Sequence, residues 1–285
     1  NLIKGLILNR ISEGFYRKLE PVLCDELAAS GYGGVTLLGA VPVNSALTLE
    51  SRYLGLKLPG EIEDLKDKIS QAARIIEGNV DIDAVLKIMD AAAELNVRDD
   101  ERNISIANDE PLVMAVAQDD AFCFYYQDNL DMFRDAGVKA VPFSPLADKR
   151  LPEGASALML GGGYPERYLK ELSDNTSMLE SVRAAIRSGM PSIAECGGYM
   201  YLHKFISDET GARYPMADVI DAECRYTGHL VRFGYLYIRP DDDGTVDHAV
   251  GMKGHEFHYY DSTYEGGVCT VSKPSGEDIR KCLIS

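Results

Sequence analysis

The sequence has no long apolar run, no secretory leader pattern and few basic residues relative to acidic ones. None of its apolar stretches approaches the roughly 18–20 residues that a membrane-spanning helix needs. The chain is therefore predicted to be a soluble cytoplasmic protein without a membrane partner. Lysine and arginine together number 29 against 45 acidic residues, for a formal net charge of -16. This balance argues against nucleic-acid binding, because such binding depends on neutralising phosphates with basic side chains.

Closely paired cysteines are also missing, since the six cysteines are scattered without any CxxC spacing. Neither a metal site nor a disulfide framework is predicted, because both are usually built from closely spaced cysteines. Most of the six are predicted to be small buried side chains. Cys196 differs from the others, because it ends an apolar run in the stretch IAECGGYMYL and is followed by two glycines.

What the sequence does contain is an α/β pattern in two parts, joined by a charged segment. The first part, 1–96, has apolar strand-like runs at 1–10 and 35–42 and helical patterns at 15–30, 61–77 and 82–95. Strands separated by a helix indicate a parallel sheet. Residues 97–111 have little apolar periodicity and are predicted to form a linker.

The second part, 112–285, repeats the pattern and becomes rich in strands after residue 211. Its predicted strands lie at 113–118, 138–143, 157–163, 191–195 and within 223–238, and its predicted helices at 127–136 and 178–188. The aromatic residues at 122–126 are predicted to pack in the core.

Cys196 lies where a predicted strand turns into a predicted helix. At such a turn a nucleophile is held away from the sheet, and nearby backbone N–H groups favour a thiolate and an oxyanion. The segment LGGGYPE at 160–166 follows another predicted parallel strand, where glycines can direct N–H groups at a developing oxyanion. Taken alone, either motif is better explained by a buried cysteine or a flexible turn. Their order within one domain favours Cys196 as a nucleophile, with Gly162, Gly163 and Gly197 as oxyanion-hole donors.

The order of these motifs resembles the class I glutamine amidotransferases. More narrowly, GGGYPE followed by ECGGYMYL resembles the cobyrinic acid a,c-diamide synthase family, and so do AVAQDDAFCFYYQDNL at 115–130, FSPLAD at 143–148 and GHEFHYYDST at 254–263. The resemblance extends over nearly the whole chain. It implies an α/β fold in which the C-terminal part of a P-loop domain similar to dethiobiotin synthetase precedes a flavodoxin-like glutamine amidotransferase domain.

The resemblance also implies a function, that of a carbon–nitrogen ligase of cobalamin biosynthesis. Cys196 would attack glutamine, form a glutamyl thioester and release ammonia. ATP and Mg²⁺ would activate the a- and c-acetate carboxylates of a cobyrinate-type tetrapyrrole, which then become amides. Three alternatives stay open: amidation of nickel-sirohydrochlorin on the route to coenzyme F430, a cysteine hydrolase on the same scaffold, and a catalytically inactive binding module. Glutamine and a corrinoid or related tetrapyrrole are the expected small-molecule partners, and a homodimer is compatible with this interpretation.

Two features of the family are not found in this sequence. No GxxxxGK[ST] phosphate-binding motif occurs, so the chain is expected to be a fragment that lacks the start of the synthetase domain. Asn9 and Pro42, at the ends of predicted strands, correspond to expected adenine contacts. Family members usually supply the histidine base from a late HxH motif followed by phenylalanine, and the chain is expected to stop before it. His258 in GHEFHYY is therefore the candidate base, with a structural role as the alternative.

Overall fold

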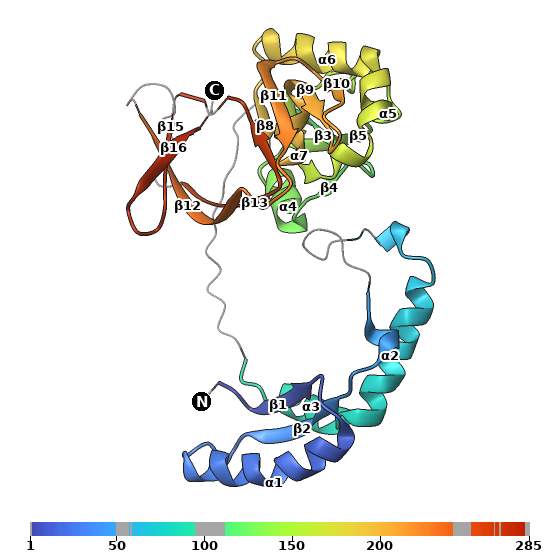
Figure 1. The fold of residues 1–285 in the computed structure, drawn as a ribbon, viewed down its shortest axis with the longest axis vertical. Helices are drawn as coiled ribbons and strands as arrows, with labels where there is room; N and C mark the ends of the chain where they lie inside the picture. Colours follow the sequence, from blue (N-terminus) through green and yellow to red (C-terminus); the bar gives the residue numbers. More distant parts are fainter. Residues whose placement is uncertain are drawn as a thin grey trace. The chain divides into compact units, whose positions relative to one another are not determined.

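The computed structural model describes residues 2–49, 57, 59–94, 112–241, 252–264, 266–267 and 269–282. The chain divides into two compact units, Asn1–Asp100 and Glu101–Ser285, called unit 1 and unit 2 below. Each unit combines helices with parallel strands (Figure 1). The predicted linker at 97–111 lies outside the described residues. Within the described ranges, no helix has both the length and the apolar character required to cross a membrane.

Among its described residues, unit 1 has a two-stranded parallel sheet and three α-helices. Its elements are β1 (Gly5–Asn9), α1 (Glu13–Ala29), β2 (Thr36–Val41), the single-turn 3₁₀ segments η1 (Ser45–Leu47) and η2 (Pro59–Glu61), α2 (Leu65–Asn79) and α3 (Ile82–Asp90). Serine and aspartate begin two of the helices: the Ser12 side chain accepts from the Phe15 N–H, and that of Asp81 from the Ala84 N–H at 2.9 Å. The strands and helices predicted for this part are confirmed, with ends shifted by a few residues.

The packing of unit 1 is limited to a few contacts around β2. Leu38, Ala40 and Val80 are its buried hydrophobic residues among those described. At Gly39, which has a φ of 129°, a Cβ atom would lie 2.1 Å from the carbonyl oxygen of Asn79. Glycine therefore allows the end of α2 to approach the strand closely.

Unit 2 begins with a four-stranded parallel sheet in the order β5-β3-β6-β8. The elements up to the end of this sheet are β3 (Val113–Ala117), β4 (Phe122–Phe124), α4 (Gln127–Asp135), β5 (Lys139–Phe143), β6 (Ala157–Leu160), β7 (Gly162–Gly163), η3 (Pro165–Arg167), α5 (Leu169–Asp174), α6 (Thr176–Arg187), β8 (Ser192–Ala194) and α7 (Gly197–Tyr201). Neighbouring strands β6 and β8 are parallel, so the segments that follow them meet at one edge of the sheet. The predicted strand at 157–163 is wrong in its second half, because the chain leaves the sheet at Gly161 and pairs instead with β4.

The remainder of unit 2 is made mostly of strands, as its sequence predicts. They are β9 (His203–Ser207), β10 (Arg213–Pro215), β11 (Ile220–Tyr226), β12 (Arg232–Pro240), β13 (Met252–His258), β14 (Tyr260–Ser262), β15 (Cys269–Ser272) and β16 (Asp278–Cys282). Two further four-stranded sheets result, with the orders β10-β9-β11-β14 and β13-β12-β15-β16. Gly228, with a φ of 73°, lies in the turn that separates β11 from β12.

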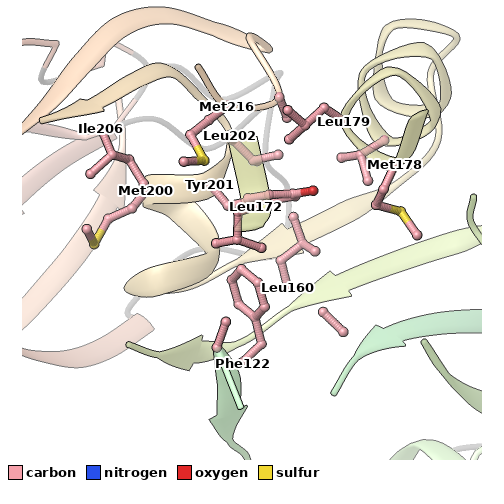
Figure 2. Packing of buried hydrophobic residues seen from close by; sticks show 14 of the residues in the cluster. Phe122, Leu160, Leu172, Met178, Leu179, Met200, Tyr201, Leu202, Ile206 and Met216 are labelled. Atoms are coloured by element: carbon pink, nitrogen blue, oxygen red, sulfur yellow. The ribbon is translucent and has the colours of Figure 1, made fainter. Parts of the chain in front are cut away.

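The main core of unit 2 draws side chains from the parallel sheet, α5, α6, α7 and β9 (Figure 2). Phe122 and Tyr201 are fully buried, and their rings meet edge to face with centroids 5.4 Å apart. Burying each such large side chain contributes about 1.5–3 kcal/mol. The predicted core role of 122–126 holds for Phe122, whereas Tyr126 at the other end is 71% exposed. The core thus lies directly beneath the sheet edge where β6 and β8 end.

Candidate active site

Cys196 occupies the turn between β8 and α7, as its sequence predicts. Its backbone has a φ of 50° and a ψ of −111°, a conformation that non-glycine residues rarely adopt. A strained turn of this kind holds a nucleophilic side chain out from the edge of a sheet. The Cys196 side chain is exposed, while Gly197 and Gly198 directly behind it are buried. The cysteine side chain is therefore accessible, while the backbone that follows it is fixed in the interior.

Gly198 connects the cysteine turn to the glycine-rich segment after β6. Its N–H group donates to the carbonyl oxygens of Gly161 and Glu195, both at 2.9 Å. A Cβ atom on Gly198 would lie only 2.1 Å from the carbonyl oxygen of Leu160. Glycine is thus required at this position for the start of α7 to pack against β6.

Gly161, Gly162 and Gly163 are buried beside the cysteine. A Cβ atom on Gly162 would lie 3.4 Å from the Cβ of Cys196, and one on Gly163 would lie 2.1 Å from the carbonyl oxygen of Ala121. At 163 a side chain would therefore collide with the backbone before β4, whereas a Cβ at 162 would be in ordinary van der Waals contact with Cys196.

Two of the three predicted oxyanion donors act on the cysteine sulfur. Burial raises the pKa of the Cys196 thiol, and hydrogen bonds from the backbone N–H groups of Gly197 and Gly163 partly offset this rise, while the charges of Glu166 and Glu195 add to it. The side chain is reachable from solvent, yet the protein atoms around it remove much of its hydration. Because the net shift is upward, the thiol holds its proton at neutral pH and needs a base to release it. Among the described contacts, none joins the N–H group of Gly162, the third predicted donor, to the sulfur.

His258 ends β13, and its Nδ1 lies 2.5 Å from the carbonyl oxygen of Tyr260. A carbonyl oxygen only accepts, so Nδ1 carries the proton and Nε2 has the free lone pair. Burial lowers the pKa of His258, which favours the neutral ring. Among the contacts of the described residues, however, none joins this imidazole to the sulfur of Cys196. The structure thus gives His258 the tautomer of a base without bringing it to the nucleophile.

His203 is a residue whose position the sequence does not reveal. Its ring is fully buried, with Nδ1 2.9 Å from the carbonyl oxygen of Tyr199 and Nε2 2.7 Å from the Oγ of Ser262. Burial lowers its pKa, so the ring is neutral. The ring thereby joins α7, the helix that follows Cys196, to β14, which begins two residues after β13 ends. Nothing in the sequence signals the contact with Ser262, because His203 and Ser262 are 59 residues apart.

Comparison with known proteins identifies the family. Residues 113–279 match the family described as the CobB/CobQ-like glutamine amidotransferase domain, which is more than half of the 285 residues. The chain belongs to this family. The matched region contains the glycine-rich segment, Cys196 and His258. The resemblance seen in the sequence motifs is therefore confirmed, and the site described above belongs to a CobB/CobQ-like amidotransferase domain.

Similar proteins with curated names extend the match beyond this domain. A cobyrinate a,c-diamide synthase of Caldanaerobacter subterraneus subsp. tengcongensis is 36% identical over 98% of this chain and 61% of its own length. Proteins of the same name from Listeria innocua and Picrophilus torridus are 35% and 38% identical, over 98% and 90% of this chain. The chain spans about three fifths of the length of these relatives, or 61%, 60% and 56%.

Asn9 and Pro42 lie together in unit 1. Asn9 is the last residue of β1 and is paired with Val41, the last residue of β2, which Pro42 follows. Because β1 and β2 are parallel, both residues are at the carboxyl end of the sheet, where ligands bind in α/β folds. The two residues thus share one sheet edge, although the sequence contains no GxxxxGK[ST] loop to hold the phosphates of a nucleotide.

Proposed function

We propose that unit 2 hydrolyses the side-chain amide of glutamine, with Cys196 as the nucleophile. The observation that carries this proposal is the strained turn at Cys196, at which the N–H groups of Gly163 and Gly197 meet the sulfur. Donors placed beside a nucleophile in this way can hold the oxygen of the substrate carbonyl as it becomes negatively charged. The membership of the chain in the CobB/CobQ-like amidotransferase family supports the same chemistry.

The reaction proceeds in two steps. The Cys196 thiolate attacks the amide carbon, and the π electrons of the carbonyl move to its oxygen, beside the two N–H groups. When the oxyanion collapses, the carbon–nitrogen bond breaks, and the nitrogen takes the proton that the base removed from the thiol and leaves as ammonia. A glutamyl thioester remains on Cys196. Water then attacks the thioester, releasing glutamate and restoring the thiol.

His258 is the proposed base of this reaction. The raised pKa of the Cys196 thiol creates the need for a group that takes its proton, and a neutral imidazole with a free Nε2 can do so. The support for this assignment is the tautomer set by Tyr260. A structural role for His258 at the end of β13 would leave the same hydrogen bond in place, and the pH dependence of labelling in His258→Gln distinguishes the two roles.

For the whole protein, we propose ATP-dependent amidation of the a- and c-acetate carboxylates of a cobyrinate-type tetrapyrrole, using ammonia from unit 2. The names of the relatives support cobyrinate as the substrate. Unit 1 would be the C-terminal part of a P-loop synthetase domain, in which Asn9 and Pro42 contact adenine and Mg²⁺ accompanies the nucleotide. ATP supplies the activation of the carboxylate. Asn9 and Pro42 fit only the part of such a site that contacts adenine. Their proposed role is therefore limited to orienting the adenine ring.

The proposal is tested by labelling the protein with 6-diazo-5-oxo-norleucine, an electrophilic glutamine analogue, and mapping the modified residue by mass spectrometry. We expect Cys196 to be modified, and glutamine to slow the modification by competing for the pocket. Cys24 is also exposed and serves as an internal control, because it lies in α1 of unit 1 and should stay unmodified. In Cys196→Ser, labelling should fall by at least about a thousandfold.

A folded wild-type protein whose Cys196 is not labelled, or is labelled no faster than Cys24, would contradict the proposal. In that case the inactive-module interpretation would be preferred. Replacing His258 with glutamine separates the two roles of this residue. A base predicts a large loss of labelling at neutral pH that diminishes as the pH approaches that of thiol ionisation, whereas a structural residue predicts an equal loss at every pH.

A further inference from the structure

The hydroxyl group of Tyr125 lies between the end of β3 and the glycine-rich segment after β6. Its Oη accepts a hydrogen bond from the N–H of Gly161 at 2.8 Å and donates one to the carbonyl oxygen of Ala117. The two partners are 36 and 8 residues away in the sequence. One side chain therefore connects the central strand of the parallel sheet to the segment that carries the oxyanion donor.

Gly161 is held from both sides. Its N–H group is bound by Tyr125, and its carbonyl oxygen accepts from the N–H of Gly198 in the cysteine turn at 2.9 Å. A Cβ atom on Gly161 would lie 2.5 Å from the Cζ of Tyr125. The absence of a side chain at 161 is thus what allows the phenol to reach the backbone.

The residues next to Tyr125 support the same segment. β4 ends at Phe124 and pairs with β7, so that Phe122 is opposite Gly163 and Phe124 is opposite Gly162. The ring of Phe124 lies 3.4 Å from the position that a Cβ of Gly162 would occupy. The backbone of Gly161–Gly163 therefore packs against the strand and tyrosine at 122–125, and the side chain of Tyr125 fixes it at Gly161 by a hydrogen bond.

We propose that Tyr125 is a positioning residue that sets the direction of the Gly163 N–H group toward the reacting carbonyl oxygen. It acts through Gly161: if the Gly161 N–H lost its partner, the segment between Gly161 and Gly163 would be free to shift relative to the cysteine. A small misplacement of an oxyanion donor is costly, because its interaction depends on short distances and alignment. This inference rests on the glutaminase function proposed above.

The protonation state of the Tyr125 hydroxyl allows it to make both hydrogen bonds. Burial raises the pKa of Tyr125 to about 12. The hydroxyl consequently keeps its proton in neutral solution and can donate to Ala117 while it accepts from Gly161. Phenylalanine at this position would keep the ring and its packing and remove both hydrogen bonds.

The chain provides a matched control in the next residue. Tyr126 is 71% exposed and is the N-cap residue directly before α4. Its replacement by phenylalanine removes the same hydroxyl group from the same stretch of sequence. Any effect of Tyr125→Phe that Tyr126→Phe does not share is due to the position of the hydroxyl.

The test uses two reagents on Cys196. Iodoacetamide alkylates the sulfur with loss of iodide and forms no oxyanion, so its rate reports the reactivity of the thiol. When the γ-semialdehyde of glutamate binds, the thiol proton passes to the base, the sulfur bonds to the carbonyl carbon, and the carbonyl oxygen becomes an anionic oxygen beside the oxyanion donors. Its binding therefore depends on those donors. The dissociation constant of the aldehyde is obtained from its protection of Cys196 against iodoacetamide, measured by mass spectrometry.

We expect Tyr125→Phe to weaken aldehyde binding by about tenfold or more, with the alkylation rate in its absence changed by less than about twofold. Tyr126→Phe should change neither quantity. Equal aldehyde binding in Tyr125→Phe and wild type would overturn the inference, as would a parallel loss of both quantities, which indicates general disorder. If the aldehyde does not protect wild-type Cys196 at all, the proposed function is itself wrong and the inference is wrong with it.

Hydrogen exchange keeps the inference testable should Tyr125→Phe fold poorly. In the wild-type protein, the Gly161 amide should exchange slowly, since the amide is buried and donates to the half-buried phenol of Tyr125. Fast exchange at Gly161 would overturn the inference without any variant.

Discussion

The two units of this chain have similar α/β patterns in sequence but differ greatly in how much they bury. Unit 1 buries Leu38, Ala40 and Val80, while Val22 on α1 and Met89 on α3 are 60% and 64% exposed. Unit 2 has a large cluster of buried side chains from its parallel sheet, α5, α6, α7 and neighbouring strands (Figure 2), and a second, smaller cluster that includes β3 and β6. A strand–helix pattern therefore does not by itself determine whether an apolar face is covered.

The difference in burial accompanies a difference in how tightly the backbone is held at each candidate site. Around Cys196, positions 161, 163 and 198 have no room for a Cβ atom, with the nearest atoms 2.1–2.5 Å away. At the edge of unit 1, Asn9 and Pro42 are held by the pairing of only two strands. Of the two candidate sites, the one with the more tightly held backbone therefore lies in the unit with the large core.

The largest contrast is expected from truncating leucines in the two units. Leu172 on α5 is fully buried, and Leu172→Ala should lower the free energy of unfolding of unit 2 by about 2–5 kcal/mol. Leu86 on α3 is 49% exposed, and Leu86→Ala should change that of unit 1 by less than about 0.5 kcal/mol. Hydrogen exchange followed by mass spectrometry in a urea series reports each unit separately. Equal losses would mean that the comparison between the units does not hold in solution.

Glycine-to-alanine substitutions should change the stabilities of the two units in opposite directions. Gly198→Ala would bring a Cβ to 2.1 Å from the Leu160 carbonyl oxygen, which should destabilise unit 2 by about 1–3 kcal/mol and displace the cysteine turn. Gly78→Ala, near the end of α2, meets nothing within 4 Å and should stabilise unit 1 by about 0.5–1 kcal/mol. The unfolding midpoints measure both, and 6-diazo-5-oxo-norleucine labelling should be lost only in Gly198→Ala. A stable, fully labelled Gly198→Ala protein would contradict the described packing.

The smallest expected effect concerns pH. All five histidines lie beyond residue 200, so histidine titration affects unit 2 alone. Burial lowers the pKa of His203 below its ordinary value of 6.5, and the unfolded chain therefore binds more protons than the folded one just below that pH. The stabilisation from neutral His203 is present above pH 6.5 and is lost as the pH falls below it. His258 contributes in the same direction, because burial lowers its pKa as well.

The measurement for this pH effect is the unfolding midpoint of each unit at about pH 7.5 and about pH 5.5, on either side of the ordinary histidine pKa. The midpoint of unit 2 should fall more in wild type than in His203→Gln, in which the titrating group is absent. An unchanged pH dependence in His203→Gln would mean that the ring is not held neutral in the folded state.

Local pattern was enough to predict the larger elements and the turn at Cys196. Apolar runs bounded by glycine or proline predicted β1, β2, β3 and β8, and helical spacing predicted α1 and α6, because these signals depend on neighbouring residues. The pairing of β4 with β7 could not be predicted, since the latter contains two residues and has no periodicity. The roles of Cys196, Gly163 and Gly197 stay predictions, although the structure brings the three residues together.

The sequence by itself determined the α/β pattern, the family and the identity of the candidate nucleophile, because each rests on residues that are close together in the chain. Tertiary structure decided what surrounds that nucleophile. Tyr125 reaches Gly161 across 36 residues, and His203 reaches Ser262 across 59. Contacts of this kind depend on which strands and helices pack together, and no local pattern of residues specifies that.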